Sequence, residues 1–423
     1  MKARLSLVLA ATLGLAACQG DNATPAATTA DAAAQENLLT LVPQEPLSNA
    51  QKGRLAAISN RPFSEQVNVA RVASAPGQLL RQGSLLRLAI APGLNVVAAG
   101  QRVQQRGPND VSWGGPLQGS THGWAQMVLG ADGLVGTVTV GLVSYKIEPL
   151  GNGLHAVSRI DQSGFPDEHP ADNPAGVLDA PPAFEPLTAR NPGDGTVGIQ
   201  AVSTVNVLVV YTAAAAAATS NISSLIQLAV DETNTSYVNS GININMVRVH
   251  TAQVTYNESG RTFSQHVASL RGTTDGSMDN VHTLRNTYGA DVVVLVVNDS
   301  EACGIASTIK ATATTAFAVA HYSCITGYYS FGHEVGHLQG ARHDRFVDGS
   351  TTPYAYGHGY IPSTKNWRTV MAYGNNCSNC TRIQWWSNPL KTYPVTGQVM
   401  GTAAYEDNAR VLNLTAPTVA AFR

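Results

Sequence analysis

The second half of the chain alternates strand-type and helix-type patterns of apolar residues. A continuous apolar run at 205–211 is typical of a buried strand. Between 220 and 239 the apolar residues recur at helical spacing and fall on one face, namely Ile222, Leu225, Ile226, Ala229 and Val230. The pair Ser240-Gly241 favours a helix end directly after this run.

The pattern continues with shorter runs as far as residue 321. They predict a half-buried strand at 242–249, a helix around 278–288, a Val-rich central strand at 291–297 and an edge strand at 316–321. Strands that alternate with helices indicate an α/β domain with a mostly parallel, twisted sheet. We expect this domain to span 201–423.

The first half shows a different pattern. Strand-like runs such as 85–90 and 136–140 predict a mainly β domain at 38–165, without a catalytic cluster. Seven prolines between Pro166 and Pro192 argue against regular structure in 166–200, so we expect a linker there that is open to activating proteolysis. The Ala/Thr-rich stretch 19–37 is typical of a flexible tether.

The first 18 residues predict export from the cell. Lys2 and Arg4 precede a short apolar run at 5–17, the pattern of a signal peptide. The run ends in Leu-Ala-Ala-Cys18, which resembles the bacterial lipoprotein box, in which the Cys is acylated and anchors the protein to a membrane. The alternative is ordinary signal-peptidase cleavage with Cys18 incidental. We therefore expect an outer-membrane lipoprotein or a secreted extracellular protein.

The composition of the chain limits the kinds of partner that we expect. Charged residues are only 13% of the chain and the net charge is −2, so nothing favours a nucleic-acid partner, and we expect a monomer. Besides Cys18 the chain has four cysteines, which allow three pairings. Local spacing favours Cys303–Cys324 and Cys377–Cys380 in an oxidising compartment. A zinc site at Cys377-x-x-Cys380 is the alternative, but no second Cys pair stands at a matching spacing.

The segment 331–344, Phe-Gly-His-Glu-Val-Gly-His-Leu-Gln-Gly-Ala-Arg-His-Asp, carries the strongest chemical signal. Positions i and i+4 share a helix face, so His333 and His337 can bind one zinc ion, and Glu334 can take a proton from a water there. Gly340 lets the chain turn, so that His343 completes the ligand set. Three protein ligands leave one position open, as in catalytic sites; a structural zinc site needs a fourth.

This extended segment resembles the metzincin signature, and the sequence at 369–374 resembles the Met-turn of that family. The resemblance implies that Met371 lies beneath the three imidazoles and that Tyr373 approaches the metal and binds an oxyanion. Core packing of Met371 and pocket packing of Tyr373 are the alternatives. Asp344 after the third His resembles the reprolysin branch; its alternative is a solvent-facing or salt-bridged carboxylate.

A closer resemblance covers roughly 200–423. The runs 206–211 and 383–389, with the two motifs between them, look like the bacterial peptidyl-Asp metalloendopeptidases. Members of that family cut on the N-terminal side of Asp, which implies a cation in the substrate pocket. Arg382 is the first candidate, with Arg368 and Lys365 as weaker ones. The alternative for Arg382 is a surface charge.

The region before 200 resembles the pro-segment of reprolysin-type enzymes at 145–150 and 155–156. The resemblance implies a zymogen inhibited by its own propeptide. No Cys lies between Cys18 and Cys303, so the thiolate that blocks zinc in many metzincins is absent. We hypothesise that a carboxylate or imidazole of Asp167, Glu168 or His169 caps the metal instead. Calcium is plausible in this class, but no ligand loop of known spacing is present.

Together these features predict a zinc-dependent endopeptidase that acts on proteins or peptides, with Glu334 as general base. Two other functions stay open from the sequence. One is a non-enzymatic surface lipoprotein that serves as a binding module. The other is a zinc hydrolase that acts on a non-protein amide.

Overall fold

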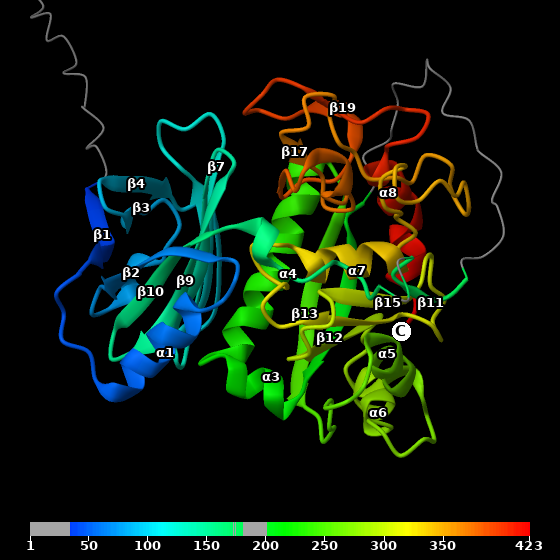
Figure 1. The fold of residues 1–423 in the computed structure, drawn as a ribbon, viewed down its shortest axis with the longest axis horizontal. Coiled ribbons are helices and arrows are strands. Elements are labelled where there is room, and N and C mark those ends of the chain that lie inside the picture. Colours follow the sequence, from blue (N-terminus) through cyan, green and yellow to red (C-terminus); the bar gives the residue numbers. More distant parts are fainter. Residues whose placement is uncertain (1–33, 172, 174, 181–200) are drawn as a thin grey trace, which may run out of the picture. The chain divides into compact units, whose positions relative to one another are not determined.

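The computed structural model describes residues 34–171, 173, 175–180 and 201–423. The signal peptide, Cys18 and almost all of the tether predicted above lie outside these residues. Residues Gln35–Arg423 form one compact unit, which contains two large β-sheets (Figure 1). Strand β1 begins at Gln35, so the end of the predicted tether at 35–37 belongs to a strand, which corrects that expectation.

The first sheet has ten strands in the order β4-β3-β1-β2-β10-β9-β8-β7-β6-β5. Only the pair β1 and β3 is parallel within it. The strands are β1 (Gln35–Leu41), β2 (Ser64–Val72), β3 (Leu85–Ala91), β4 (Leu94–Ala99), β5 (Arg102–Gly107), β6 (Asp110–Pro116), β7 (Gly123–Gly130), β8 (Gly133–Val140), β9 (Val143–Gly151) and β10 (Leu154–Ile160). Helices α1 (Asn49–Ser59) and α2 (Pro76–Leu79) accompany them.

The second sheet has six strands in the order β11-β15-β16-β14-β12-β13. All neighbours are parallel except β15 and β16, so β15 and β11 run opposite to the other four. The strands are β11 (Val177–Asp179), β12 (Ser203–Tyr211), β13 (Ile244–Gln253), β14 (Val292–Val297), β15 (Gly304–Thr308) and β16 (Phe317–His321). The chain is therefore of mixed α/β class.

Two predictions about this sheet need correction. Strand β16 was predicted at an edge, but it lies between β14 and β15, because the small residues of 304–308 form a strand that the apolar pattern did not indicate. The Pro-rich stretch was predicted to lack regular structure, yet 177–179 form β11 at the sheet edge. The central strand β14 is buried along its whole length, as its Val-rich run predicts.

Helices cover both faces of the second sheet. Along β12, Val207 and Val209 belong to one apolar cluster and Leu208 and Val210 to another, because successive side chains point to opposite faces. The helices are α3 (Ala213–Ala218), α4 (Ile222–Ser240), α5 (Phe263–Arg271), α6 (Asn280–Thr287), α7 (Ser330–Leu338) and α8 (Asn408–Val419). Helix α4 ends at Gly241 in the left-handed conformation (φ 71°), as predicted. Among the described residues, no helix is long and apolar enough to cross a membrane.

Helix α4 also contacts the first sheet. The carboxylate of Asp231 accepts a hydrogen bond from Ser112 of β6, and that of Glu232 accepts one of 2.7 Å from Thr137 of β8. The remaining short strands follow α7: β17 (Trp367–Arg368), β18 (Thr381–Arg382), β19 (Asn388–Thr392) and β20 (Val399–Met400). The structure pairs Cys303 with Cys324 and Cys377 with Cys380, the pairings that local spacing favoured.

Candidate metal centre and active site

Helix α7 brings two histidines to one buried point. His333 and His337 are fully buried, and their Nδ1 atoms lie 2.9 Å from the carbonyl oxygens of Val370 and Ala341. A carbonyl can only accept, so each Nδ1 carries the proton and each Nε2 presents a lone pair. Within the described residues, Nε2 of His333 has no hydrogen-bond partner, as expected of a nitrogen that a metal would satisfy.

A turn after α7 adds the third imidazole. Gly340 has φ 104°, a conformation that favours glycine, and the chain then reverses so that Nε2 of His343 lies 2.9 Å from Nε2 of His337. The carbonyl oxygen of His343 accepts a 2.8 Å hydrogen bond from His358, which fixes the backbone there. The ligand atoms of the three predicted histidines, together with one from His169, all lie within 4.8 Å of one another.

Burial keeps these imidazoles in the form that binds metals. Burial, followed by the neighbouring His337, holds the pKa of His333 and of His343 well below the usual range. Burial also lowers the pKa of His337 to about 4. The rings are therefore neutral at pH 7 and can donate lone pairs, so the donor set fits a divalent transition metal such as zinc.

The Met-turn packs against the underside of α7. A Cβ at Gly336 would lie 2.6 Å from the ring of Trp386 and 3.2 Å from Sδ of Met371, so this glycine makes room for both side chains. Asp344 is 4% exposed rather than solvent-facing. Its Oδ2 accepts a 2.8 Å hydrogen bond from the backbone N–H of Tyr373, which ties the residue after the third His to the Met-turn.

Glu334 lies beside the histidines and is fully buried. Burial first, and Glu168 second, raise the pKa of its carboxyl well above the usual range, while Arg382 opposes them. The side chain crosses over β15 at Gly304, where a Cβ would lie 2.4 Å from Oε1 of Glu334. A glycine at this point of the strand is therefore required for the carboxylate to reach its position.

Tyr373 also reaches the cluster. Its ring lies 4.5 Å from that of His343, centroid to centroid, and its hydroxyl oxygen lies 2.5 Å from Nδ1 of His169. The side chain thus borders the histidine cluster instead of packing elsewhere in the core.

The fourth imidazole comes from the segment hypothesised to cap the metal. His169 is buried, and its Nε2 lies 3.1 Å from Oε1 of Glu334. Its ring passes under Gly176, where a Cβ would lie 1.8 Å from ring atom Cε1. Of the three hypothesised residues, Glu168 and His169 are buried, and each belongs to a group of side chains that could hold a metal ion. Asp167 is exposed and belongs to neither group.

The basic residues predicted for the substrate pocket lie in different surroundings. Arg382 is fully buried, and its Nη1 donates to Oε2 of Glu168 at 2.7 Å and to the carbonyl of Tyr328 at 3.0 Å. Its guanidinium lies over the Tyr328 ring, 4.3 Å from the centroid. Arg382 is therefore no surface charge. Lys365 is exposed and bonds Asn376 at 3.0 Å.

Arg368 is the register partner of Arg382 in the pair β17–β18 and is also buried. It donates to the carbonyl of Cys380 and, at 3.2 Å, to the hydroxyl of Tyr328. Burial lowers its pKa to about 10, so it remains charged at pH 7. Two cations thus share one wall, and a cavity next to them is lined by residues that include Phe165, Glu168, His169, Tyr328, Tyr373 and Arg382.

Sequence reasoning missed Tyr328 and the clearances at Gly304 and Gly176. Tyr328 stands three residues before the motif segment, and no pattern of apolar residues marks it as a pocket wall. The glycines lie in stretches without helical or alternating patterns, where glycine ordinarily indicates a turn. Their roles appear only when Glu334 and His169 are placed over them.

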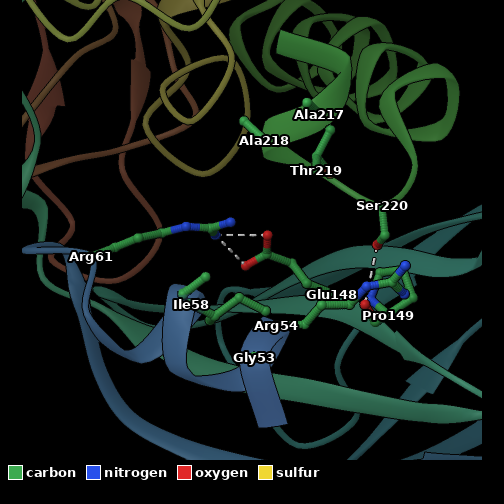
Figure 2. Close-up of a pocket in the computed structure, with 11 residues that line it drawn as sticks. Gly53, Arg54, Ile58, Arg61, Glu148, Pro149, Ala217, Ala218, Thr219 and Ser220 are labelled. Atoms are coloured by element: carbon green, nitrogen blue, oxygen red, sulfur yellow. Dashed lines mark hydrogen bonds and ion pairs between the residues drawn. The ribbon is translucent and has the colours of Figure 1, made fainter. Parts of the chain in front are cut away.

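A second cavity lies away from this cluster, between α1, β9, the end of α3 and the two residues that follow it. Figure 2 shows the guanidinium of Arg61 directed at the carboxylate of Glu148, an ion pair of 2.8 Å, while Ser220 bonds the carbonyl of Pro149. None of the predicted site residues lines this cavity. It therefore adds nothing to the candidate site.

Comparisons with known proteins point to metallopeptidases. A model of metallo-peptidase family M12 matches residues 201–387. A peptidyl-Asp metalloendopeptidase of Stenotrophomonas maltophilia (strain K279a) is 45% identical over 302 residues, which are 70% of either chain. One of Xanthomonas campestris pv. campestris is 45% identical over 71% of this chain and 70% of its own. One of Pseudomonas fragi is 42% identical over 45% of this chain and 100% of its own.

Proposed function

Because the chain belongs to the family of the peptidyl-Asp metalloendopeptidases, and is therefore a metalloendopeptidase, we propose that it is a zinc enzyme that cuts proteins before acidic residues. The observation that carries the proposal is the convergence of three buried imidazoles, with Glu334 beside them. His333, His337 and His343 would hold the ion. The number and type of these donors are those of a catalytic zinc site.

Zinc at this point would polarise the peptide carbonyl and lower the pKa of a water, the chemistry that peptide hydrolysis needs. Glu334 is the general base in our proposal: its carboxylate takes a proton from the attacking water and passes it to the leaving amine. Met371 supports the imidazoles from beneath.

Tyr373 is proposed to stabilise the oxyanion. A phenol O–H can donate to the negative charge that develops on the carbonyl oxygen, and in this protein the hydroxyl lies at the edge of the histidine cluster. The 2.5 Å contact with His169 supports its reach into the site.

The acidic preference would come from Arg382. Its buried guanidinium binds a carboxylate in this structure, that of Glu168, at 2.7 Å. A buried arginine favours a carboxylate over a neutral side chain of the same shape, because an uncharged partner leaves the charge unsatisfied. We propose that the side chain after the cleaved bond takes the place that Glu168 holds.

We also propose the organisation of the precursor predicted from the sequence. Residues 1–18 would direct export, with Cys18 as lipid anchor if the lipoprotein box is used, and 19–34 would tether the rest, because 35–37 belong to β1. A propeptide at 38–165 and an activation linker at 166–200 would precede the protease domain at 201–423. The contacts of Glu168 and His169 with the site support inhibition by the propeptide.

The first test is cleavage of a denatured protein mixture by the enzyme after activation, with and without a zinc chelator, followed by mass spectrometry of the new termini. We expect cuts that the chelator abolishes and new N-termini that begin with Asp. Chelator-sensitive cuts before other residues would contradict the proposed preference for Asp but support the zinc peptidase. No cuts at all would instead favour a binding module or a hydrolase of non-protein amides.

A further inference from the structure

The segment around His169 occupies the edge of the second sheet. The carbonyl oxygens of Asp167 and Glu168 accept hydrogen bonds of 2.8 and 2.9 Å from the N–H groups of Cys303 and Gly304. The carbonyl of Gly176 accepts one from Ala306, and β11 continues the pairing in parallel to β15. The pairing of β11 with β15 is strand addition, the mode by which extended peptides bind sheet edges, and the hydrogen bonds of Asp167 and Glu168 lie at the start of β15.

His169 lies between two anchored points of this segment. It directly follows Glu168, whose carbonyl accepts from Gly304, and it precedes Gly176, whose carbonyl accepts from Ala306. Its imidazole enters the histidine cluster. The carbonyls of Asp167 and Glu168 are held by the N–H groups of Cys303 and of Gly304, the first residue of β15. The segment therefore presents a side chain, and not either of these peptide groups, at the reactive point.

The side chain of Glu168 enters the wall formed by the two arginines. Its Oε2 binds Arg382 at 2.7 Å, and the two side chains are 2% and 1% exposed. The ring of Tyr328 lies under the guanidinium and closes the wall. Because both charges are removed from water, each depends on the other, and the loss of either partner leaves a buried charge unpaired.

We propose that His169 and Glu168 keep the precursor inactive at two points at once: His169 completes the ligand set of the metal, and Glu168 fills the pocket meant for the acidic side chain of the substrate. This inference rests on the proposed function and adds the regulation of the same site. Nε2 of His169 also lies 3.1 Å from Glu334 and its Nδ1 lies 2.5 Å from the hydroxyl of Tyr373, so the two side chains together contact Glu334, Tyr373 and Arg382.

The structure supplies a matched control. Asp167 is next in sequence, carries an acidic side chain like Glu168 and has its carbonyl bonded by the neighbouring Cys303, yet it is exposed. Glu168→Gln and Asp167→Asn therefore remove the same charge from adjacent positions. Only the first change touches the pocket.

The test uses the full-length precursor and two measurements. The first is the visible absorption of Co²⁺ put in place of zinc, in a Glu334→Gln background so that no sample can cut itself. This spectrum reports the ligands of the metal and needs no turnover. The second is cleavage of fluorescently labelled casein by the precursor with Glu334 intact, with mass spectrometry to verify that the chain is still full length.

We expect His169→Ala to change the Co²⁺ spectrum to that of the activated enzyme, whereas Glu168→Gln and Asp167→Asn keep the precursor spectrum. Casein cleavage by the intact precursor should rise about 10- to 100-fold in Glu168→Gln, the range for loss of a hydrogen bond between charged groups. It should rise at least as much in His169→Ala and stay within about twofold in Asp167→Asn. If His169→Ala does not fold, His169→Asn keeps a polar side chain there.

Two results would overturn the inference. An unchanged Co²⁺ spectrum in the folded His169 variant would show that the imidazole is no ligand. Cleavage by Glu168→Gln that equals the Asp167→Asn control would show that the pocket carboxylate does not hold the precursor closed. A failure of the proposed function looks different: the activated wild-type enzyme would not cut casein, and the Co²⁺ spectra would still decide the role of His169.

Discussion

Replacing Arg382 by Met in the activated enzyme should remove the preference for Asp. The guanidinium reaches a carboxylate at 2.7 Å while only 1% exposed, so solvent screens the contact little. A hydrogen bond to a charged group contributes about 1.5–3 kcal/mol. At about 1.4 kcal/mol per factor of ten, kcat/KM for a peptide with Asp after the cut should fall about 10- to 100-fold.

The measurement compares two quenched fluorescent peptides that differ only in Asp or Asn after the cleaved bond. We expect Arg382→Met to lower kcat/KM for the Asp peptide and to leave the Asn peptide within about threefold, because the amide never gained from the charge. Lys365→Met is the control, since it removes a cation that is exposed and bonded to Asn376. Arg382→Lys should lie between, because it keeps the charge and loses the planar fork.

Arg382 also donates to the carbonyl of Tyr328, so each variant must first show a thermal midpoint near that of the wild type. If a folded Arg382→Met enzyme keeps the full Asp-to-Asn ratio, the pocket assignment is wrong. Arg368 would then be the next candidate, because it is buried beside Arg382 and stays charged at pH 7.

Three further predictions concern other parts of the molecule. Glu334→Gln should lower kcat of the activated enzyme about 1,000-fold and leave its zinc content, measured by metal analysis, unchanged. Activity near that of the wild type would show that Glu334 is not the general base. Gly176→Ala, whose Cβ would lie 1.8 Å from His169, should let the precursor cleave casein, whereas Gly119→Ala, with similar φ and open space, should not; equal effects would point to backbone strain alone. Burial raises the pKa of Glu232 from 4.5 to about 7, so its contribution to stability is full below pH 4.5 and is lost as pH rises to about 7. The gain in thermal midpoint from Glu232→Gln should thus be larger at pH 8 than at pH 5, and an equal gain at both would contradict this.

The ligand histidines were predictable because their geometry is local. His333 and His337 share a helix face by spacing alone, and Gly340 marks the only turn needed to bring His343 back. The apolar patterns that predicted α4 and β14 are equally local, since each depends on which neighbouring positions face a core. Such features require no knowledge of distant parts of the chain.

The other half of the site depends on contacts between residues far apart in sequence. His169 and Glu334 are separated by 165 positions, and Glu168 and Arg382 by 214. The sequence could propose Glu168 and His169 as capping residues only because no Cys was available. It could not select between them or indicate that both are used, because the choice depends on how β11 pairs with β15.

Latency and specificity are linked in this arrangement because both use the same guanidinium. Any substitution at Arg382 that relaxes the preference for Asp also removes the partner of Glu168, and so weakens the closed precursor. The reverse does not hold in our proposal, in which activation cuts the linker after His169, so that Glu168 is absent from the activated enzyme. Arg382→Met should therefore raise casein cleavage by the intact precursor and lower Asp selectivity after activation, whereas Glu168→Gln should do only the first. A variant of Arg382 that lost selectivity and stayed fully latent would separate the two roles and refute the link.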